Sequence, residues 1–523
     1  MIRAGASYSS TSETGRNPVA RRVLVLWAVA VFAALLTGVA WALASPIGSS
    51  PDDDYHMTSI WCPPPIKDSG CRTGVAANGA PTVWVPQQVA VAPHCYAFHA
   101  EIPGNCTGTL SGDQLSQTER VDTGAYPGPY YRFMHMFVGK SVMASVVVMR
   151  IVNVVIAVTL GLLLALAAPP LRRKAMGWAV LGTCIPLGMF LITSINPSAW
   201  TIMGIPAFAV AMDSLCRVET RTLRWANGAL AVTAATLAAV SRADGGLYLF
   251  VALGAVGLIN LHRLRGRYDA FVAAGLAVAL GVWSVLSSRQ ATMADTGLGR
   301  PKTQWAQDLA FTNILDLPNL WLGIYGIPGW GMGWLDTAVP ATVWIPLIII
   351  AGVLIRAGLA QATWQQRTAA GVILLVCGVM PVYLLSKTGD AIGINYQPRY
   401  LLPLFIVMFY VLLRPARDSA TPLFTPKTTR TLVIALTIIH AIALLYVLRR
   451  YTVGVNGPLF SFSGTPWWWT KSGPGPFWDW LAGTIAFGVL AALMTGFQRW
   501  GTVAPDPKNP APVVEPAKAV PAP

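Results

Sequence analysis

Long apolar stretches alternate with short polar ones along most of this chain. We recognise twelve apolar runs, near residues 23–44, 142–168, 175–193, 199–215, 225–240, 247–261, 270–286, 342–355, 369–385, 400–413, 432–448 and 478–497. A helix of about 20 apolar residues spans the hydrocarbon core of a bilayer and satisfies its own backbone hydrogen bonds there. The pattern therefore predicts an all-α integral membrane protein with about twelve transmembrane helices.

Composition agrees with this pattern, since hydrophobic residues make up 54% of the chain and charged residues only 11%. A soluble protein of this length needs far more charge to cover its surface. The net charge of +15 does not indicate a nucleic-acid partner, because the basic residues form short clusters between the apolar runs. Such clusters set the orientation of a protein in the membrane.

The basic clusters fall in alternate connections, at residues 172–174, 217–224, 262–267, 356–367 and 414–430. Basic loops remain in the cytoplasm. We therefore expect a multi-pass plasma-membrane protein with both termini in the cytoplasm. Its two large loops, at residues 45–131 and 287–340, are then extracytoplasmic.

The two ends of the chain differ from the membrane domain predicted over residues 23–500. Residues 1–22 are polar and rich in serine, which predicts a disordered cytoplasmic segment. The first apolar run is too long for a signal peptide and is interpreted as an uncleaved anchor. Residues 501–523 are rich in Pro and Ala, which predicts a low-complexity cytoplasmic tail.

Four of the seven cysteines lie in the first outer loop: Cys62, Cys71, Cys95 and Cys106. An oxidising compartment favours disulfides, so we expect two of them in this loop. Four cysteines allow three pairings, and the sequence does not choose among them. A zinc site is the alternative, but the spacings are irregular and contain no CxxC pair.

Three adjacent carboxylates, Asp52, Asp53 and Asp54, follow the first apolar run, with His56 two residues further on. Like charges at such spacing raise at least one pKa unless a cation compensates. A carboxylate at the mouth of a helix bundle can act as a general base on a hydroxyl group. The alternative is a solvated acidic turn after a helix end.

Two arginines at outer turns are candidates for binding an anion. Arg399 stands where an outer loop enters a helix, and its planar fork matches phosphate oxygens. The alternative is an interfacial Arg–Tyr anchor with Tyr400. Arg242 lies in a tight turn with Asp244, and the pair is either a structural salt bridge or part of an anion site.

Two further outer segments have amphipathic or aromatic character. Residues 130–143 carry Arg132, His135 and Lys140 among apolar residues, a pattern typical of a segment at the membrane interface. We therefore expect membrane lipids among the partners. A late loop is rich in tryptophan, which predicts an aromatic belt or a surface that stacks on sugars. These residues are Trp467, Trp468, Trp469, Trp478 and Trp480.

Two of these segments together resemble the bacterial family called domain of unknown function 2142, which is grouped with the GT-C glycosyltransferases. The resemblance rests on Pro51-Asp52-Asp53-Asp54-Tyr55-His56 and on Gln397-Pro398-Arg399-Tyr400-Leu401-Leu402-Pro403. The turn Arg242-Ala243-Asp244-Gly245 also resembles R-P-[DE]-G turns seen in GT-C enzymes. The family resemblance extends over about residues 23–413. The chain departs from the family pattern at Ser198, where many relatives carry Asp. The insert between Cys62 and Cys106 has no place in the general pattern.

The resemblance implies a GT-C fold and an inverting transfer of a sugar from a polyprenyl-phosphate donor. The acceptor is a cell-envelope glycan or glycolipid on the extracytoplasmic face. By this resemblance Asp52 or Asp53 is the general base, and Asp54 and His56 support it. Arg399, and secondarily Arg242, neutralises the leaving phosphate.

The resemblance also indicates contacts to sugar or lipid from Tyr396, Gln397 and Tyr400. It requires no cofactor, although some GT-C enzymes hold a divalent metal near the first-loop acid, which corresponds here to Asp52–Asp54. Two other classes remain open. One is a carrier or flippase for a lipid-linked sugar, and the other is a non-enzymatic membrane scaffold. The sequence contains no P-loop, H-E-x-x-H or G-x-S-x-G pattern.

Overall fold

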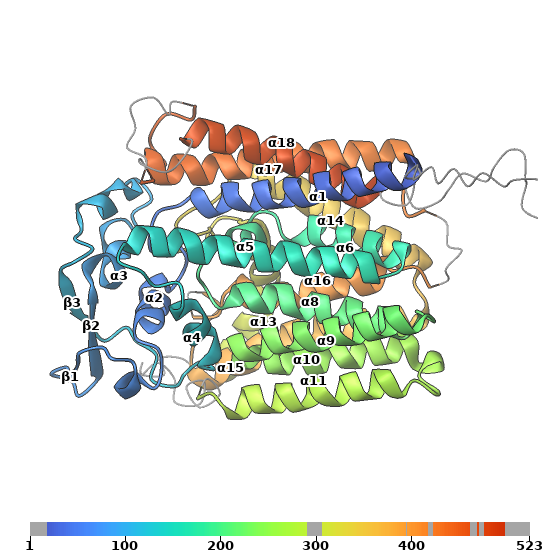
Figure 1. The fold of residues 1–523 in the computed structure, drawn as a ribbon, viewed down its shortest axis with the longest axis horizontal. Coiled ribbons are helices and arrows are strands. Elements are labelled where there is room, and N and C mark those ends of the chain that lie inside the picture. The colour runs from blue at the N-terminus through green and yellow to red at the C-terminus, as the bar shows by residue number, and fades with distance from the viewer. Residues whose placement is uncertain are drawn as a thin grey trace, which may run out of the picture.

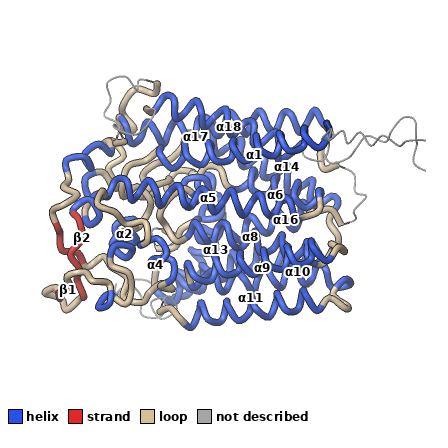
Figure 2. The backbone as a smooth tube through the Cα atoms, viewed as in Figure 1, coloured by secondary structure: helices blue, strands red, loops and turns tan. Residues whose placement is uncertain are grey.

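The chain folds into a bundle of helices that run along the long axis of the molecule, with a smaller layer across one end (Figure 1). The computed structural model describes residues 18–289, 306–393, 395–416, 422–460, 468–469 and 475–496. Helix dominates, as Figure 2 shows, and the predicted all-α membrane class is confirmed. Most of the predicted N-terminal segment and the whole predicted C-terminal tail lie outside the described residues.

Within the described ranges, ten helices are long and apolar enough to cross a membrane. They are α1 (Pro18–Leu43), α5 (Val142–Ala167), α8 (Ser198–Leu215), α9 (Arg221–Ser241), α10 (Ala243–Asn260), α11 (Tyr268–Leu286), α14 (Ala341–Gln361), α15 (Trp364–Thr388), α17 (Pro426–Thr452) and α18 (Pro476–Gly496). Each corresponds to one of the predicted runs.

The two remaining predicted runs form shorter helices. The run at 400–413 is α16 (Pro398–Leu413), which is almost completely buried in the centre of the bundle. The run at 175–193 is divided into α6 (Pro170–Thr183) and α7 (Leu187–Ile192). Pro186, at the start of α7, has no backbone N–H and interrupts the helical hydrogen bonds at this point.

The second predicted outer loop is only partly a loop. It contains α13 (Ala306–Leu322), which packs against α15, and the Trp321 indole donates to the Cys377 carbonyl at 3.1 Å. This helix carries Asp308 and Asp316 and was not among the predicted apolar runs. Its partly apolar face is covered by α15, so tertiary packing supports a helix that hydropathy alone does not indicate.

The first outer loop folds into a cap made of short helices and a small sheet. Its elements are α2 (Asp53–Trp61), α3 (Gln87–Ala90), α4 (Pro129–His135) and the strands β1 (Thr73–Val75), β2 (Pro81–Pro86) and β3 (Leu115–Thr118). The strands pair antiparallel in the order β1-β2-β3, with Val83 opposite Thr73 on one side and Thr118 on the other.

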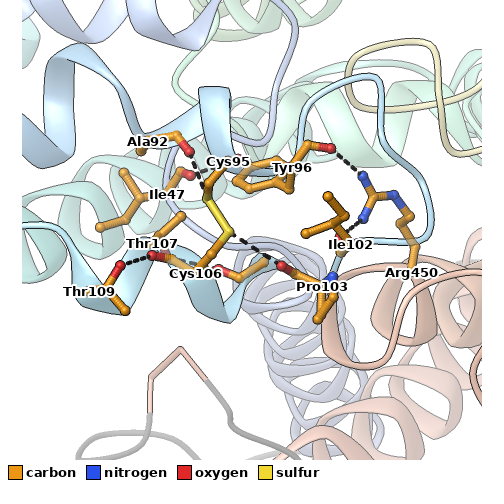
Figure 3. The surroundings of a disulfide bond; sticks show 11 residues. Ile47, Ala92, Cys95, Tyr96, Ile102, Pro103, Cys106, Thr107, Thr109 and Arg450 are labelled. Carbon is orange, nitrogen blue, oxygen red and sulfur yellow. Dashed lines mark hydrogen bonds between the residues drawn. A yellow bond between two sulfur atoms is a disulfide. The ribbon is translucent and has the colours of Figure 1, made fainter.

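Both predicted disulfides are present in the cap. Cys62 at the end of α2 pairs with Cys71, and Cys95 pairs with Cys106. Each bridge joins cysteines that are close in the sequence, at separations of 9 and 11 residues. Each bridge therefore constrains a short local segment. The first lies beside α2, and the second, shown in Figure 3, lies beside α17.

Arg450, in the last turn of α17, fastens the cap to the bundle. Its guanidinium donates to the carbonyls of Ile102 and Tyr96 at 2.6 and 2.9 Å, as Figure 3 shows. It also forms an ion pair with Asp336 at 2.8 Å, and Asp336 accepts from the Phe98 N–H. One buried cation thus joins the two predicted outer loops and a membrane helix.

Arg150 of α5 holds the C-terminal end of α1 in a similar way, through hydrogen bonds to backbone carbonyls. Its guanidinium donates to the carbonyls of Ala42, Ser45 and Pro46 at 2.7 to 2.9 Å. A cation at a helix C-terminus satisfies carbonyls that have no partner within the helix. The chain is therefore held rigidly just before the acidic run.

Two of the late tryptophans are not part of an exposed aromatic surface. Trp468 and Trp469 are buried, and both indoles donate to the Leu43 carbonyl at the end of α1. Both rings are thus covered by protein and cannot stack on a sugar. Trp478 is exposed, and Trp467 lies outside the described residues.

Three of the basic clusters meet one acid at the opposite end of the bundle. Asp213 of α8 is fully buried and lies 3.2 to 3.5 Å from the guanidinium nitrogens of Arg172, Arg217 and Arg414. Tyr410 donates to the same carboxylate at 2.7 Å. Three of the basic connections that the charge pattern predicts on one side of the membrane are thus adjacent in space.

Candidate functional site

The acidic run begins at a sharp backbone turn. Asp52 precedes α2 with φ 60° and ψ 20°, in the left-handed region. Aspartate is one of the few residues other than glycine that adopt this conformation readily. The preceding carbonyl, that of Pro51, accepts from the Asn196 side-chain amide at 2.8 Å. The turn at Asp52 is therefore held by Asn196, a residue outside the first large loop.

Asp52 contacts Arg399, the residue predicted to bind phosphate. The Oδ2 of Asp52 lies 2.7 Å from the Nη2 of Arg399, and this nitrogen also donates to the Tyr400 hydroxyl at 2.9 Å. Pro398 starts α16, the position where proline is favoured, so Arg399 lies in the first helical turn. The candidate base and the candidate phosphate ligand form one ion pair.

A third charged residue, Arg120, completes this group. It donates to both oxygens of Asp54 at 2.8 and 3.0 Å and lies 3.2 Å from the Oδ1 of Asp52. Its position after β3, 66 residues from Asp54, carries no motif. Sequence reasoning missed it, because only the folding of the cap brings the segment after β3 to the start of α2.

The three carboxylates have different surroundings. The Asp52 side chain is 37% exposed. Burial alone raises its pKa, but the adjacent Arg399 outweighs burial, and the pKa lies well below its usual range. Asp53 is fully buried, and burial raises its pKa to about 7 against the opposing charge of Arg150. It accepts the Ser50 N–H at 2.9 Å and is turned away from Arg399.

His56 is buried beside this group, with its Nδ1 3.0 Å from the Tyr131 hydroxyl. Burial lowers its pKa to about 3, so the ring is neutral at physiological pH. Among the described residues no hydrogen bond joins His56 to an aspartate. The ring instead packs edge-on against Tyr126, with centroids 5.3 Å apart.

Two guanidinium groups meet on the ring of Tyr400. Arg242 lies 4.5 Å and Arg399 5.0 Å from its centroid. Arg242 follows α9 and is held by Asp244 through hydrogen bonds of 2.9 to 3.1 Å. The Tyr396 ring lies 5.4 Å from that of Tyr400, and Gln397 is nearly buried at the start of α16. The arrangement can neutralise an anion placed beside Tyr400.

The aspartates are not arranged as a metal centre. Asp52 and Asp54 are directed at arginines, and Asp53 is directed at a backbone N–H. Among the residues that the structure describes, no group of three His, Cys, Asp or Glu side chains is placed to hold a metal ion. The residues present therefore do not fit the divalent metal that the resemblance allows here.

Two other residues that position the site were within reach of sequence reasoning. Arg150 is an ionisable residue inside an apolar run, which is itself a sign of function or of buried pairing. Asn196 precedes α8, and its Oδ1 accepts from the Ser198 N–H at 2.9 Å, as a helix cap does. Its second contact, to the carbonyl of Pro51, depends on the tertiary fold.

Comparison with known proteins identifies one family. Residues 35–408 match the family described as "Predicted membrane protein (DUF2142)". This range includes the acidic run, the Arg242 turn and the beginning of α16 with Arg399. No curated protein matches the chain. The match covers well over half of the sequence, and the chain belongs to the DUF2142 family of multi-pass membrane proteins.

Proposed function

We propose that this protein is a glycosyltransferase that moves a sugar from a polyprenyl-phosphate donor to a cell-envelope acceptor on the extracytoplasmic face. The observation that carries the proposal is the 2.7 Å contact between Asp52 and Arg399. It joins a partly exposed carboxylate to a cation suited to phosphate, at the capped end of a membrane bundle.

In the proposed reaction the donor phosphate first competes with Asp52 for Arg399. An incoming phosphate oxygen takes the guanidinium N–H groups, and Asp52 loses the strongest of the charge contacts that lower its pKa, while Arg120 remains. The carboxylate becomes a stronger base only when donor is bound. The resting ion pair thereby limits proton abstraction to the loaded site.

The transfer itself is a single displacement at the anomeric carbon. The acceptor oxygen bonds to that carbon, and the bond from the carbon to the phosphate oxygen breaks. The electron pair leaves with the polyprenyl phosphate beside Arg399, and the acceptor proton passes to Asp52. Attack opposite the leaving group inverts the anomeric configuration. Positioning and charge stabilisation supply most of the rate, because polyprenyl phosphate is already a good leaving group.

Asp52 is a better base candidate than Asp53. Asp53 is fully enclosed and hydrogen-bonded to Ser50, whereas Asp52 is open to an incoming hydroxyl. A general base must come within hydrogen-bond distance of the proton that it removes. Asp54, paired with Arg120, and neutral His56 then have supporting roles.

An apolar groove supports a lipid-linked donor. It has a volume of about 310 Å³ and is lined by α1, α5, α6, α8 and α18. Thr193 and Ile192 line it, only a few residues before Asn196, which holds the turn at Pro51. We propose that a polyprenyl chain lies in this groove with its phosphate at the end formed by Ile192 and Thr193.

The test uses protein in nanodiscs with a panel of polyprenyl-phosphate sugars and envelope glycan acceptors. Donor consumption and product are scored for wild type, Asp52→Asn, Asp53→Asn and Arg399→Ala. Asp113→Asn removes an exposed carboxylate from the same cap and serves as the matched control. Turnover that requires Asp52 and Arg399 but not Asp113 supports the proposal. If donors bind but no form of the protein consumes them, the result indicates a carrier for a lipid-linked sugar. If no form binds a donor, the result favours a non-enzymatic scaffold.

A further inference from the structure

A second open site lies on the cap beside the candidate active site. It is a cleft of about 550 Å³ between three segments of the first outer loop and the end of α11. Its walls are Pro64 to Lys67, Thr73, Pro81, Thr123, Gly124, Tyr126, Gly128, Arg132 and Ser287. None of these residues belongs to the carboxylate–arginine group described above.

Tyr126 separates this cleft from the candidate active site. It lines the cleft, and its ring also lies 5.5 Å from the Arg242 guanidinium and 5.3 Å from the His56 ring. Burial is the largest influence on its hydroxyl and raises the pKa to about 12, so the phenol is neutral. A ligand in the cleft is therefore separated from the group around Asp52 by the ring of Tyr126.

The cleft carries positive charge that is not compensated locally. Its charged lining residues, Lys67 and Arg132, are both basic and both exposed, and no acid lines the cleft. In the described part of the chain, neither side chain is engaged in a hydrogen bond or an ion pair. Two free cations facing one cleft favour an anionic ligand.

The remaining lining suits a carbohydrate. The ring of Tyr126 and the pyrrolidine rings of Pro64, Pro65 and Pro81 offer flat apolar surfaces that can cover the face of a sugar. Thr73, Thr123 and Ser287 add hydroxyl groups that both donate and accept hydrogen bonds.

Arg132 is held in position by its helix. The neighbouring residues of α4, Tyr130, Tyr131 and Met134, are buried, which fixes the face that Arg132 presents. Gly128 leaves space for the guanidinium, since a Cβ added there would lie 2.9 Å from the Nη2 of Arg132. The Arg132 guanidinium thus lies close to Gly128 at the wall of the cleft.

We propose that this cleft is the acceptor site and that it binds an anionic glycan, one bearing uronate or phosphate groups. The inference rests on the proposed glycosyltransferase function and names the class of its acceptor. A lipid headgroup fits less well, because β1 and β2, which contribute Thr73 and Pro81, lie beyond the end of the bundle (Figure 1). The acceptor chain enters from outside the membrane and presents its hydroxyl past Tyr126.

Binding is tested with the full-length protein in neutral phosphatidylcholine nanodiscs. The probes are a tetramer of galacturonate and a neutral tetramer of galactose. The variants are Lys67→Ala, Arg132→Ala and the double substitution, with Arg72→Ala as a matched control. Arg72 is an exposed cation of the same cap and stacks on Trp84, outside the cleft. Thermal unfolding confirms that each variant is folded.

We expect galacturonate tetramer to bind at least about tenfold more tightly than the neutral tetramer, and each single substitution to weaken it by about tenfold. Arg72→Ala should retain this binding. Equal affinity for both tetramers, or affinity unchanged in the double variant, overturns the proposal. The proposal is also overturned if the Lys67 and Arg132 substitutions change only binding to phosphatidylglycerol nanodiscs and leave galacturonate binding unchanged. Galacturonate binding that persists without any sugar transfer refutes the proposed function but not the anionic site.

Discussion

Arg399 and Asp52 form an ion pair of 2.7 Å although they are 347 residues apart in the sequence. The pair connects the first turn of α16 with the residue that precedes α2. Arg120 supplies a second cation to the same carboxylate, at 3.2 Å. Three segments that are distant in the chain therefore converge on one carboxylate at the capped end of the bundle.

Replacing Asp52 separates its chemical role from its structural role. Asp52→Asn keeps the size of the side chain and its ability to adopt the left-handed turn, but removes the base. We expect kcat to fall about a hundred- to ten-thousand-fold, the usual contribution of a general base. Tm should also fall, because the amide no longer neutralises the buried Arg399. Steady-state kinetics with donor and acceptor measure the first effect. An Asp52→Asn protein with near wild-type kcat would exclude Asp52 as the base.

Replacing Arg399 by lysine tests whether its planar fork matters as well as its charge. Arg399→Lys keeps a cation near Asp52 but cannot bind phosphate oxygens in the bidentate manner. We expect donor affinity to fall by about tenfold, the cost of one charge-assisted hydrogen bond. Titration of donor into nanodiscs measures it, with Arg72→Lys as the control. Unchanged donor affinity would place the phosphate elsewhere.

Asp53 predicts a pH dependence of stability. Its pKa is raised from 3.8 to about 7 in the folded protein, so the native state retains a proton that the unfolded chain releases. Stability should therefore fall as the pH rises from about 4 to about 7, by at most about 4 kcal/mol, and then level off. Thermal unfolding between pH 5 and 8 measures this fall. Asp53→Asn should flatten the profile, and an equally steep profile in that variant would contradict the assignment.

Arg450 is expected to be the main attachment of the cap. Arg450→Ala removes the cation that pairs with Asp336 and the guanidinium donors to the carbonyls of Tyr96 and Ile102. Loss of one partner of a buried ion pair costs about 3–5 kcal/mol. Tm should fall accordingly and the cap should become sensitive to trypsin. Arg449→Ala, which removes contacts to the Gly457 carbonyl and to the Tyr446 ring, should have a smaller effect.

The disulfides predict a response to reduction that is local to the cap. Removing a native disulfide from a small extracytoplasmic domain typically costs about 2–5 kcal/mol. Cys95→Ser with Cys106→Ser should therefore lower the protease resistance of the segment that Arg450 holds. Peptide mapping without reductant should recover the pairs Cys62–Cys71 and Cys95–Cys106. Recovery of a different pairing would contradict the cap fold.

The membrane helices and the chemistry-bearing residues could be predicted because their signals are local. A run of apolar residues long enough to cross a bilayer must be helical, whatever surrounds it. The sequence alone therefore indicated twelve apolar runs, of which ten are single helices long enough to cross a membrane in the described part of the chain. It also indicated the set of four cysteines in the first large loop and the candidacy of the acidic run and Arg399. It did not determine α13, whose apolar face is stabilised by α15.

Only the tertiary structure decided which candidates act together. It turned Asp53 into the protein and Asp52 towards Arg399, chose one of three disulfide pairings, and brought in Arg120. It also placed Trp468 and Trp469 under the end of α1. The physical reason is that hydropathy acts on neighbouring residues, whereas these contacts depend on the directions in which separate segments meet. Those directions are set by packing and by buried cations such as Arg150 and Arg450.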